Sequence, residues 1–130
     1  MATHVTPYFA ATGASDAIAF YTKAFGAVEL YRIPDPDGLR LGHAEFTIGE
    51  TTLYISDEYP DHNALAHPAS FVIEVPDVDA AFQRAVDAGA TVERPLEDAP
   101  YGRGGWLRDP FGHRWNLMTS NPDFDPKDMQ

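Results

Sequence analysis

The chain has 130 residues, which suits one compact domain and is short for two of ordinary size. Its 20 acidic and 9 basic residues give a formal charge of −11, which disfavours nucleic-acid binding because acidic side chains repel phosphates. The absence of cysteine excludes disulfides and thiolate metal sites, and no apolar run is long enough for a membrane span or a signal peptide. We therefore expect a cytoplasmic protein with no nucleic-acid or membrane partner.

In chain order, the first predicted element is a strand over Val5 to Ala11, which ends at the turn-forming pair Thr12-Gly13. A helix is predicted near residues 15–25, with Ser15 as its N-cap and Gly26 as its end. Three strands then follow, over residues 28–33, 41–48 and 52–56, and the last two form a hairpin around Gly49-Glu50.

The second half of the chain predicts the same order of elements. After an acidic loop over residues 57–68, it predicts a strand over 70–75, a helix near 78–88, and strands over 91–94, 105–108 and 114–119. A loop is expected at 97–103 and a turn at Asp109-Pro110-Phe111-Gly112, while the polar tail over 121–130 is expected to fray. Several polar groups are expected to face solvent: His62, His67, His113, Asp57-Glu58 and Glu97-Asp98.

The two halves match at an offset of 63 residues. Gly26 and Gly89 each end a predicted helix, and Gly49 and Gly112 each lie between two apolar segments. Several matches at one offset, in the same context, indicate a duplicated unit of one strand, one helix and three strands. We therefore predict an α+β fold of two βαβββ modules, which form a curved mixed sheet with a concave cavity. The single domain spans residues 1–120, with module one at 5–56, module two at 69–119 and the tail at 121–130.

Three segments resemble the vicinal-oxygen-chelate superfamily. The run from Ala17 to Gly26 resembles its first helix, and Asp77-Val78-Asp79-Ala80 followed by Ala88-Gly89-Ala90 resembles its second. The segment Tyr101-Gly102-Arg103 and the run Asp109 to Trp115 are most similar to the PhnB-like branch of the glyoxalase and bleomycin-resistance proteins. The resemblance implies the fold and a homodimer, but this fold hosts isomerases, dioxygenases, thiol transferases and antibiotic binders. The Asp-Pro-Phe-Gly turn itself is predicted to be architectural, since proline and glycine set its backbone angles.

Metal-dependent members of the family bind a divalent cation through His, Glu or Gln on the first and last strands of each module. Carried over by the motifs, these positions hold Thr6, Leu53 or Tyr54, Ser70 and Asn116, which are weak ligands. We therefore predict no metal cofactor. The alternative is an unusual cation site at His4, His43 and Glu45, because His43 and Glu45 share one strand face and His4 lies two residues before Thr6.

A binding role then depends on aromatic and polar side chains in the cavity, which suit flat or cationic ligands. Strand alternation places Thr6, Tyr8, Ser70 and Asn116 on the cavity face, and turns Trp115, itself an aromatic candidate, to the other face. Arg103 could contact an anionic group or remain a surface charge. The predicted ligand-binding residues are Thr6, Tyr8, Tyr54, Ser70, Arg103, Trp106 and Asn116.

No catalytic motif is visible: there is no Ser-His-Asp order, phosphate loop or dinucleotide fingerprint. The leading hypothesis is a metal-independent small-molecule binding protein that sequesters a cationic or aromatic compound. One alternative is a metal-dependent lyase, isomerase or dioxygenase with an unusual site. Another is a sensing or interaction module without chemistry of its own.

Overall fold

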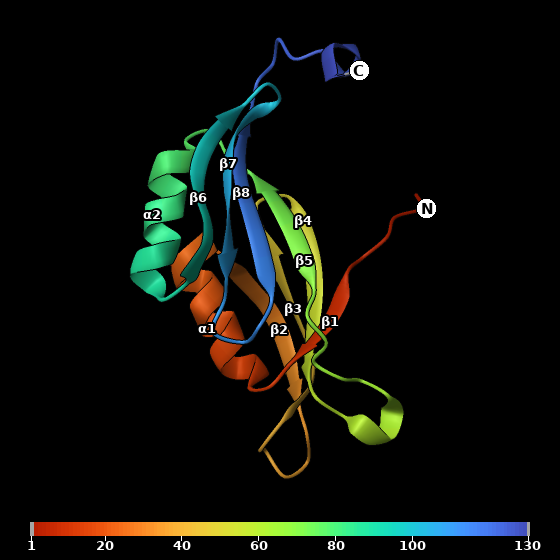
Figure 1. The fold of residues 1–130 in the computed structure, drawn as a ribbon. Coiled ribbons are helices and arrows are strands. Elements are labelled where there is room, and N and C mark those ends of the chain that lie inside the picture. Colours follow the sequence, from red (N-terminus) through yellow and green to blue (C-terminus); the bar gives the residue numbers. More distant parts are fainter. Residues whose placement is uncertain (1, 130) are drawn as a thin grey trace. The chain divides into compact units, whose positions relative to one another are not determined.

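The computed structural model describes residues 2–129. The chain forms two compact units, residues 1–67 and 68–130, which we call module one and module two. Each contains one strand, one helix and three further strands in that order (Figure 1). The predicted α+β fold of two βαβββ modules is therefore confirmed. Within residues 2–129, no helix is long and apolar enough to cross a membrane.

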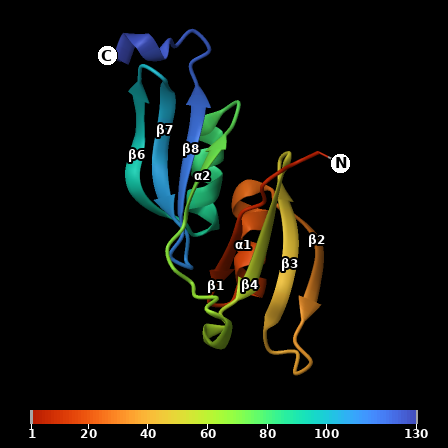
Figure 2. The same ribbon diagram turned by 90° about the vertical axis from the view of Figure 1, so that its right-hand side faces the viewer.

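Module one is a four-stranded sheet with one helix on one face (Figures 1 and 2). The strands run in the order β1-β4-β3-β2; β1 is parallel to β4, and the other neighbours are antiparallel. A short 3-10 helix follows β4. The elements are β1 (Tyr8–Ala11), α1 (Ala14–Phe25), β2 (Val28–Pro34), β3 (Leu41–Ile48), β4 (Thr51–Asp57) and η1 (Pro60–His62).

Module two repeats this topology with the strand order β5-β8-β7-β6. Here β5 is parallel to β8, and the other neighbours are antiparallel (Figure 2). The helix over 78–88 lies where the sequence predicts it. The elements are β5 (Ser70–Glu74), α2 (Val78–Ala88), β6 (Thr91–Ala99), β7 (Gly102–Arg108), β8 (Arg114–Ser120) and η2 (Pro126–Met129).

The core of each module lies between its sheet and its helix. In module one, Phe46 of β3 stacks on Tyr21 of α1, with ring centroids 5.7 Å apart, and both side chains are fully buried. In module two, a Cβ at Gly105 of β7 would lie 2.9 Å from the Phe82 ring of α2, so the absence of a side chain permits this close approach. Strand residues adjacent to such core positions therefore point to the sheet face opposite the helix. We call this the helix-free face of each module.

Strand boundaries differ most from the prediction in two regions, at the start of β1 and between β6 and β7. β1 begins at Tyr8 rather than Val5, directly after Pro7, which has no N–H to donate to a strand ladder. β6 continues to Ala99 and β7 begins at Gly102, so the predicted loop over 97–103 is mostly a strand hairpin. The pairing of Glu97 with Gly104 and of Asp98 with Arg103 extends the ladder through a segment whose composition is typical of a loop. Glu97 and Asp98 are exposed, as expected.

The predicted N-cap at Ser15 is wrong, and the predicted solvation of Asp57 is wrong with it. Helix α1 begins at Ala14, and buried Asp57 at the end of β4 caps it from 43 residues away. Its Oδ1 accepts hydrogen bonds from the backbone N–H groups of Gly13 and Ala14, both at 2.9 Å. Its Oδ2 accepts one from Leu41 N–H at 2.7 Å. A carboxylate supplied by the sheet thus replaces a local cap.

His113 is fully buried, so its predicted place at the surface is wrong. Its Nδ1 accepts a hydrogen bond of 3.0 Å from Ala69 N–H, just before β5. Asp109 holds the preceding turn: its Oδ1 accepts from the N–H groups of Phe111 and His113 at 2.8 and 2.9 Å, and its Oδ2 from Trp115 Nε1 at 2.9 Å. These hydrogen bonds hold His113 in a buried position and support the predicted architectural role of the turn. His62 and His67 are exposed as expected.

The repeated glycines occupy equivalent places in the two modules. Gly26 and Gly89 end α1 and α2, and each donates its N–H to carbonyl groups of the last helical turn. Gly49 and Gly112 turn the chain before β4 and β8 with φ of 56° and 90°, a region that favours glycine. The 63-residue offset therefore reflects a repeated structure.

Candidate ligand-binding site

The helix-free face of module one carries a continuous row of large polar side chains. The strand register places Tyr8 of β1 beside Tyr54 of β4, and Tyr54 beside Glu45 of β3. Glu45 is in turn paired with Tyr31 of the edge strand β2. Three phenols and a carboxylate thus cross all four strands at one level. We call this set, together with His43, the tyrosine cluster.

His43 links the members of the tyrosine cluster. Its Nδ1 lies 2.9 Å from the Tyr8 hydroxyl, and its Nε2 lies 2.9 Å from Glu45 Oε2. The His43 ring is edge-on to Tyr54, at 4.9 Å between centroids, and to Tyr8, at 5.3 Å. Tyr8 and Tyr54 are also perpendicular to each other, at 5.6 Å. Such edge-to-face contacts fix the rings and leave part of each π face free.

Glu45 supplies the negative charge of the cluster. Hydrogen bonds from the Tyr31 hydroxyl and from His43 hold the pKa of the Glu45 carboxyl below its usual value. The hydrogen bond that the Tyr31 hydroxyl donates to Glu45 raises the pKa of the Tyr31 phenol, because ionisation would remove this bond and place two anions side by side. Nearby Arg32 is turned away: its guanidinium binds Glu29 and the Ser15 hydroxyl of α1. The cluster therefore has the chemistry of a partly exposed anionic aromatic site.

Sequence reasoning missed Tyr31 and treated His43 and Glu45 only as an alternative metal site. A bulge between Glu29 and Tyr31 shifts the β2–β3 register, so simple alternation could not pair Tyr31 with Glu45. The His43/Glu45 spacing was a usable signal, since two residues apart on a strand share a face.

The helix-free face of module two has a different character. Trp106 of β7 and Asn116 of β8 are direct neighbours in the register, so these two predicted residues do come together. They border a hollow of ≈ 80 Å³ that Arg94, Glu97, Tyr101 and Met118 also line. The Arg114 guanidinium lies 4.3 Å above the Trp106 ring, and Arg114 also binds Glu93. One face of this indole therefore already holds a cation from the protein.

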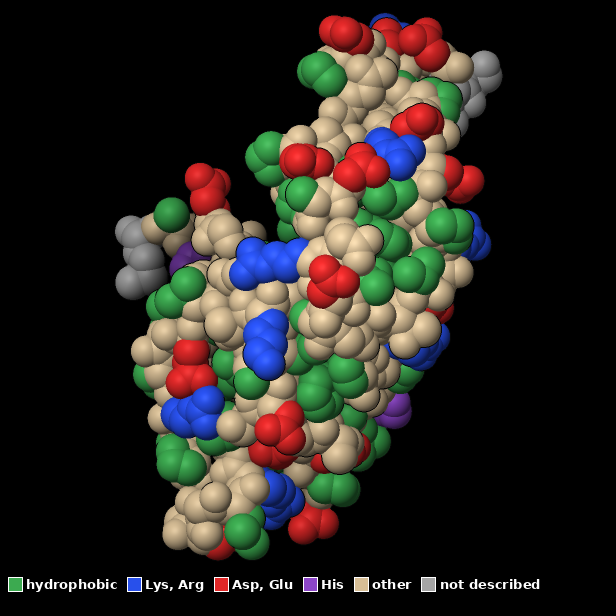
Figure 3. All heavy atoms as spheres, turned by 90° about the vertical axis from the view of Figure 1, so that its left-hand side faces the viewer, with side chains coloured by type: hydrophobic (Ala, Val, Ile, Leu, Met, Phe, Trp, Pro, Cys, Tyr) green, Lys and Arg blue, Asp and Glu red, His purple; other side chains and the backbone are tan. Residues whose placement is uncertain are grey.

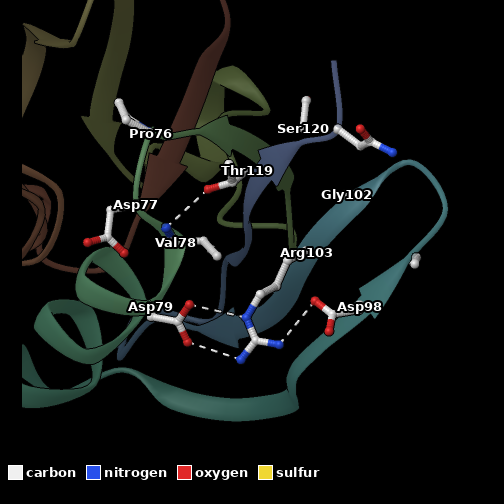
Figure 4. A pocket seen from close by; sticks show the side chains of 11 residues that line it. Pro76, Asp77, Val78, Asp79, Asp98, Gly102, Arg103, Thr119 and Ser120 are labelled. Atoms are coloured by element: carbon white, nitrogen blue, oxygen red, sulfur yellow. Dashed lines mark hydrogen bonds and ion pairs between the residues drawn. The ribbon is translucent and has the colours of Figure 1, made fainter. Parts of the chain in front are cut away.

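Arg103 lies apart from Trp106 and Asn116, on the helix side of β7. It lines an open hollow of ≈ 390 Å³ at the start of α2, together with Asp77, Thr119 and Asn121 (Figure 4). Its guanidinium binds Asp79 at 3.0 Å and Asp98 at 3.3 Å (Figure 4). These carboxylates raise the pKa of Arg103, with Asp79 the larger influence, and would compete with any anionic ligand.

The remaining predicted residues lie at strand beginnings. Thr6 is half-buried before β1, and Ser70 is the exposed first residue of β5. Trp115 is buried on the helix side and stacks on Phe71 at 4.4 Å, so strand alternation places it correctly and it does not line a cavity.

The chain matches the Glyoxalase/Bleomycin resistance protein/Dioxygenase superfamily over residues 3–117. An uncharacterized protein of Mycobacterium bovis is 43% identical over 123 residues, covering 87% of this chain and 80% of the relative. The chain belongs to this superfamily. Among solved structures, TioX from Micromonospora sp. ML1 has a TM-score of 0.77 at 25% identity, covering 92% of this chain and 100% of that one. The PhnB protein from Bacillus cereus has a TM-score of 0.68 at 23% identity, covering 91% and 100%.

The superfamily includes metal-dependent enzymes, which bind a divalent cation through side chains at four positions of the fold. Leu53 is buried on the helix side, so the fourth-strand position belongs to Tyr54. The positions implied by the resemblance then offer three hydroxyls and one amide, from Thr6, Tyr54, Ser70 and Asn116. A catalytic site needs several stronger ligands and an open position. These residues do not fit such a cation.

The alternative site at His4, His43 and Glu45 does not form either. His4 is exposed and precedes β1, while both ring nitrogens of His43 lie within hydrogen-bond distance of protein oxygens. In the described part of the chain, no group of three or more His, Asp or Glu side chains is arranged to hold a metal ion.

Proposed function

We propose that this chain is a metal-independent small-molecule binding protein, which sequesters a cationic, partly aromatic compound on the helix-free face of module one. The observation that carries the proposal is the tyrosine cluster, where three phenol rings and a carboxylate lie in one row across the sheet. We also propose that the chain lies in the PhnB-like branch of its superfamily. The run Asp109 to Trp115 supports this branch, and the likeness to the Bacillus cereus protein agrees with it in fold.

The tyrosine cluster can attract a cation in two ways. Each ring face contributes roughly 0.5–1 kcal/mol at an exposed site, and more where water is excluded. Glu45 adds a full charge at neutral pH, because hydrogen bonds from Tyr31 and His43 lower its pKa. Tyr8 is 55% exposed and Tyr31 48%, so a ligand has ring surface left to cover.

The side chains of the tyrosine cluster, rather than the total charge of −11, should determine the preference for a cationic over an anionic ligand. Figure 3 draws a face other than the helix-free face of module one, and acidic and basic side chains are interspersed on it without one dominant acidic field. Exposed charges more than about 10 Å away are largely screened at 0.1 M salt. In module two, the Arg114 guanidinium already covers one face of the Trp106 ring. We therefore assign the cationic part of the ligand to module one.

The test compares benzyltrimethylammonium with benzenesulfonate, two probes of similar size and opposite charge. Binding is followed by NMR shifts of the tyrosine rings at low and high salt. We expect the cation to bind more tightly and Glu45→Gln to weaken it roughly fivefold, the effect of one nearby charge in a watery site. Glu50→Gln, an exposed residue in the turn of the same module, removes the same charge and should change little.

Three results would count against the proposal: equal affinity for the two probes, tighter binding of benzenesulfonate, or an equal loss in the Glu45 and Glu50 variants. Shifts confined to Trp106 would move the site to module two. Because the probes carry no reactive group, the titration reports binding alone.

A further inference from the structure

Within the tyrosine cluster, three groups form a hydrogen-bonded chain of phenol, imidazole and carboxylate. The Tyr8 hydroxyl lies 2.9 Å from His43 Nδ1, and His43 Nε2 lies 2.9 Å from Glu45 Oε2. Tyr8 comes from β1 and the other two from β3, two strands of one sheet with β4 between them. A base oriented by a carboxylate and bonded to an acidic hydroxyl is the arrangement that activates a hydroxyl group.

The partners determine which way each proton points. An ionised carboxylate can only accept hydrogen bonds, so His43 Nε2 must carry a proton and donate it to Glu45. In the neutral ring, Nδ1 is then left with a lone pair and can only accept. The Tyr8 hydroxyl therefore donates to His43. The Tyr31 hydroxyl donates to the same Glu45 oxygen and helps to keep that carboxylate ionised.

We propose that Tyr8 is a general acid–base group that works without a metal, with His43 as its proton acceptor and Glu45 as the positioning residue. A proton from a ligand hydroxyl, or from a carbon next to a ligand carbonyl, passes to Tyr8 Oη. The proton of Tyr8 passes to His43 Nδ1 in the same step. The resulting imidazolium faces Glu45, which stabilises the positive charge, and the reverse step returns the proton. No electrons are transferred, and no co-reactant is needed.

The surroundings of the chain suit this role. Tyr8 is 55% exposed, so its hydroxyl group can be reached from the helix-free face. His43 is more enclosed, with 22% of its side chain exposed, because Tyr54 of β4 and Tyr31 of β2 lie edge-on or tilted against it. Glu45 is a charged group in hydrogen-bond contact with the imidazole. This activity goes beyond binding, since it assigns a reaction class to ligands with a hydroxyl or an enolisable carbonyl.

The test measures the reactivity of Tyr8 with N-acetylimidazole, without a ligand. In this reaction the Tyr8 oxygen bonds to the acetyl carbon and the bond from that carbon to the imidazole nitrogen breaks. The phenol proton goes to His43, which passes it on to the nitrogen of the departing imidazole. Acetylation of each tyrosine is followed by peptide mass spectrometry. Tyr101 is the internal reference, because it is 50% exposed and its ring packs on Phe124. We expect Tyr8 to react at least roughly tenfold faster than Tyr101. This threshold is set lower than the roughly 100-fold or larger rate increase that is typical of general-base catalysis.

Glu45→Gln and His43→Gln should each bring the rate at Tyr8 to that of Tyr101, while Glu50→Gln should leave it fast. In the unaltered protein, ¹⁵N NMR should show His43 with a proton on Nε2 and a bare Nδ1, a result that needs no variant to fold. Equal rates at Tyr8 and Tyr101, a fast rate that survives both His43→Gln and Glu45→Gln, or a proton on Nδ1 would each overturn the proposal.

Discussion

Replacing Asp57 with alanine should destabilise the protein strongly, although this residue lies in a segment that reads as a solvated loop. The carboxylate accepts three backbone hydrogen bonds, from Gly13, Ala14 and Leu41, at 2.7–2.9 Å. A hydrogen bond to a charged group contributes about 1.5 kcal/mol or more, and stranded buried donors cost a similar amount. Water entering the space left by the side chain recovers part of this loss. We therefore expect Asp57→Ala to lower the free energy of unfolding by about 3–5 kcal/mol.

Urea unfolding followed by far-ultraviolet circular dichroism measures the loss. With a slope of about 2 kcal/mol per molar, the midpoint should fall by roughly 1.5–2.5 M. Asp77→Ala is the matched control, because Asp77 is exposed and caps α2 through one bond of 3.2 Å to Ala80 N–H. Loss of one exposed cap costs about 1 kcal/mol, or roughly 0.5 M. If the Asp57 variant moved the midpoint no more than the Asp77 variant, the assigned role of Asp57 would be wrong.

Three further predictions concern ionisation, assembly and metal content. Burial raises the pKa of Tyr59 to about 12. The neutral Tyr59 phenol therefore contributes to the free energy of unfolding below about pH 10, and this contribution should be lost as pH rises from about 10 to 12. Absorbance titration at 295 nm should show a late phenol that Tyr59→Phe removes; no such component would contradict the burial. The free edge of β2 exposes Val28, Leu30 and Ile33, so light scattering at tens of micromolar should give a homodimer mass. Leu30→Lys should weaken that dimer more than Leu39→Lys in the neighbouring loop, and a monomer mass for the unaltered protein would refute it. Elemental analysis after purification without added metal should give zinc, nickel and iron far below one per chain, and a near-stoichiometric ion would refute the assignment.

Local signals predicted much of the fold. The helix over 78–88 follows from apolar spacing and a terminal glycine, and the strand over 41–48 follows from its composition and the glycine turn after it. Such signals depend on neighbours within a few residues. They fail at Asp57 and His113, whose partners lie 43–44 residues away, at Ala14 and Ala69. A buried carboxylate and an exposed one look alike in sequence, because burial is decided by the elements that close over them.

The candidate site was predicted only in part, because alternation along a strand is also a local signal. Alternation along β3 predicted that His43 and Glu45 share one face, and in the structure the two side chains are in hydrogen-bond contact there, with Tyr8 against His43. It could not join Tyr31 to them, because the bulge in β2 breaks the period of two. It also could not foresee that Arg103 binds Asp79 on the helix side, because the sequence predicts a loop at 97–103, where the structure continues β6 and begins β7.

The comparison between the two modules gives the strongest reason to seek function on the helix-free faces. On the helix side the modules repeat one device, in which the last strand caps the helix: Asp57 binds Ala14 N–H, and the Thr119 hydroxyl binds Val78 N–H. On the other face, the rows at the equivalent level, three residues before these caps on the last strand, differ entirely. Module one holds Tyr8, Tyr54 and Glu45 there, and module two holds Val72, Asn116 and Trp106. The same topology needs the same helix cap in both modules, but it places no such demand on this row. Folding therefore does not explain why the row in module one is aromatic and acidic while the row in module two holds a valine, an amide and an indole, and this difference supports the binding function that we propose for module one.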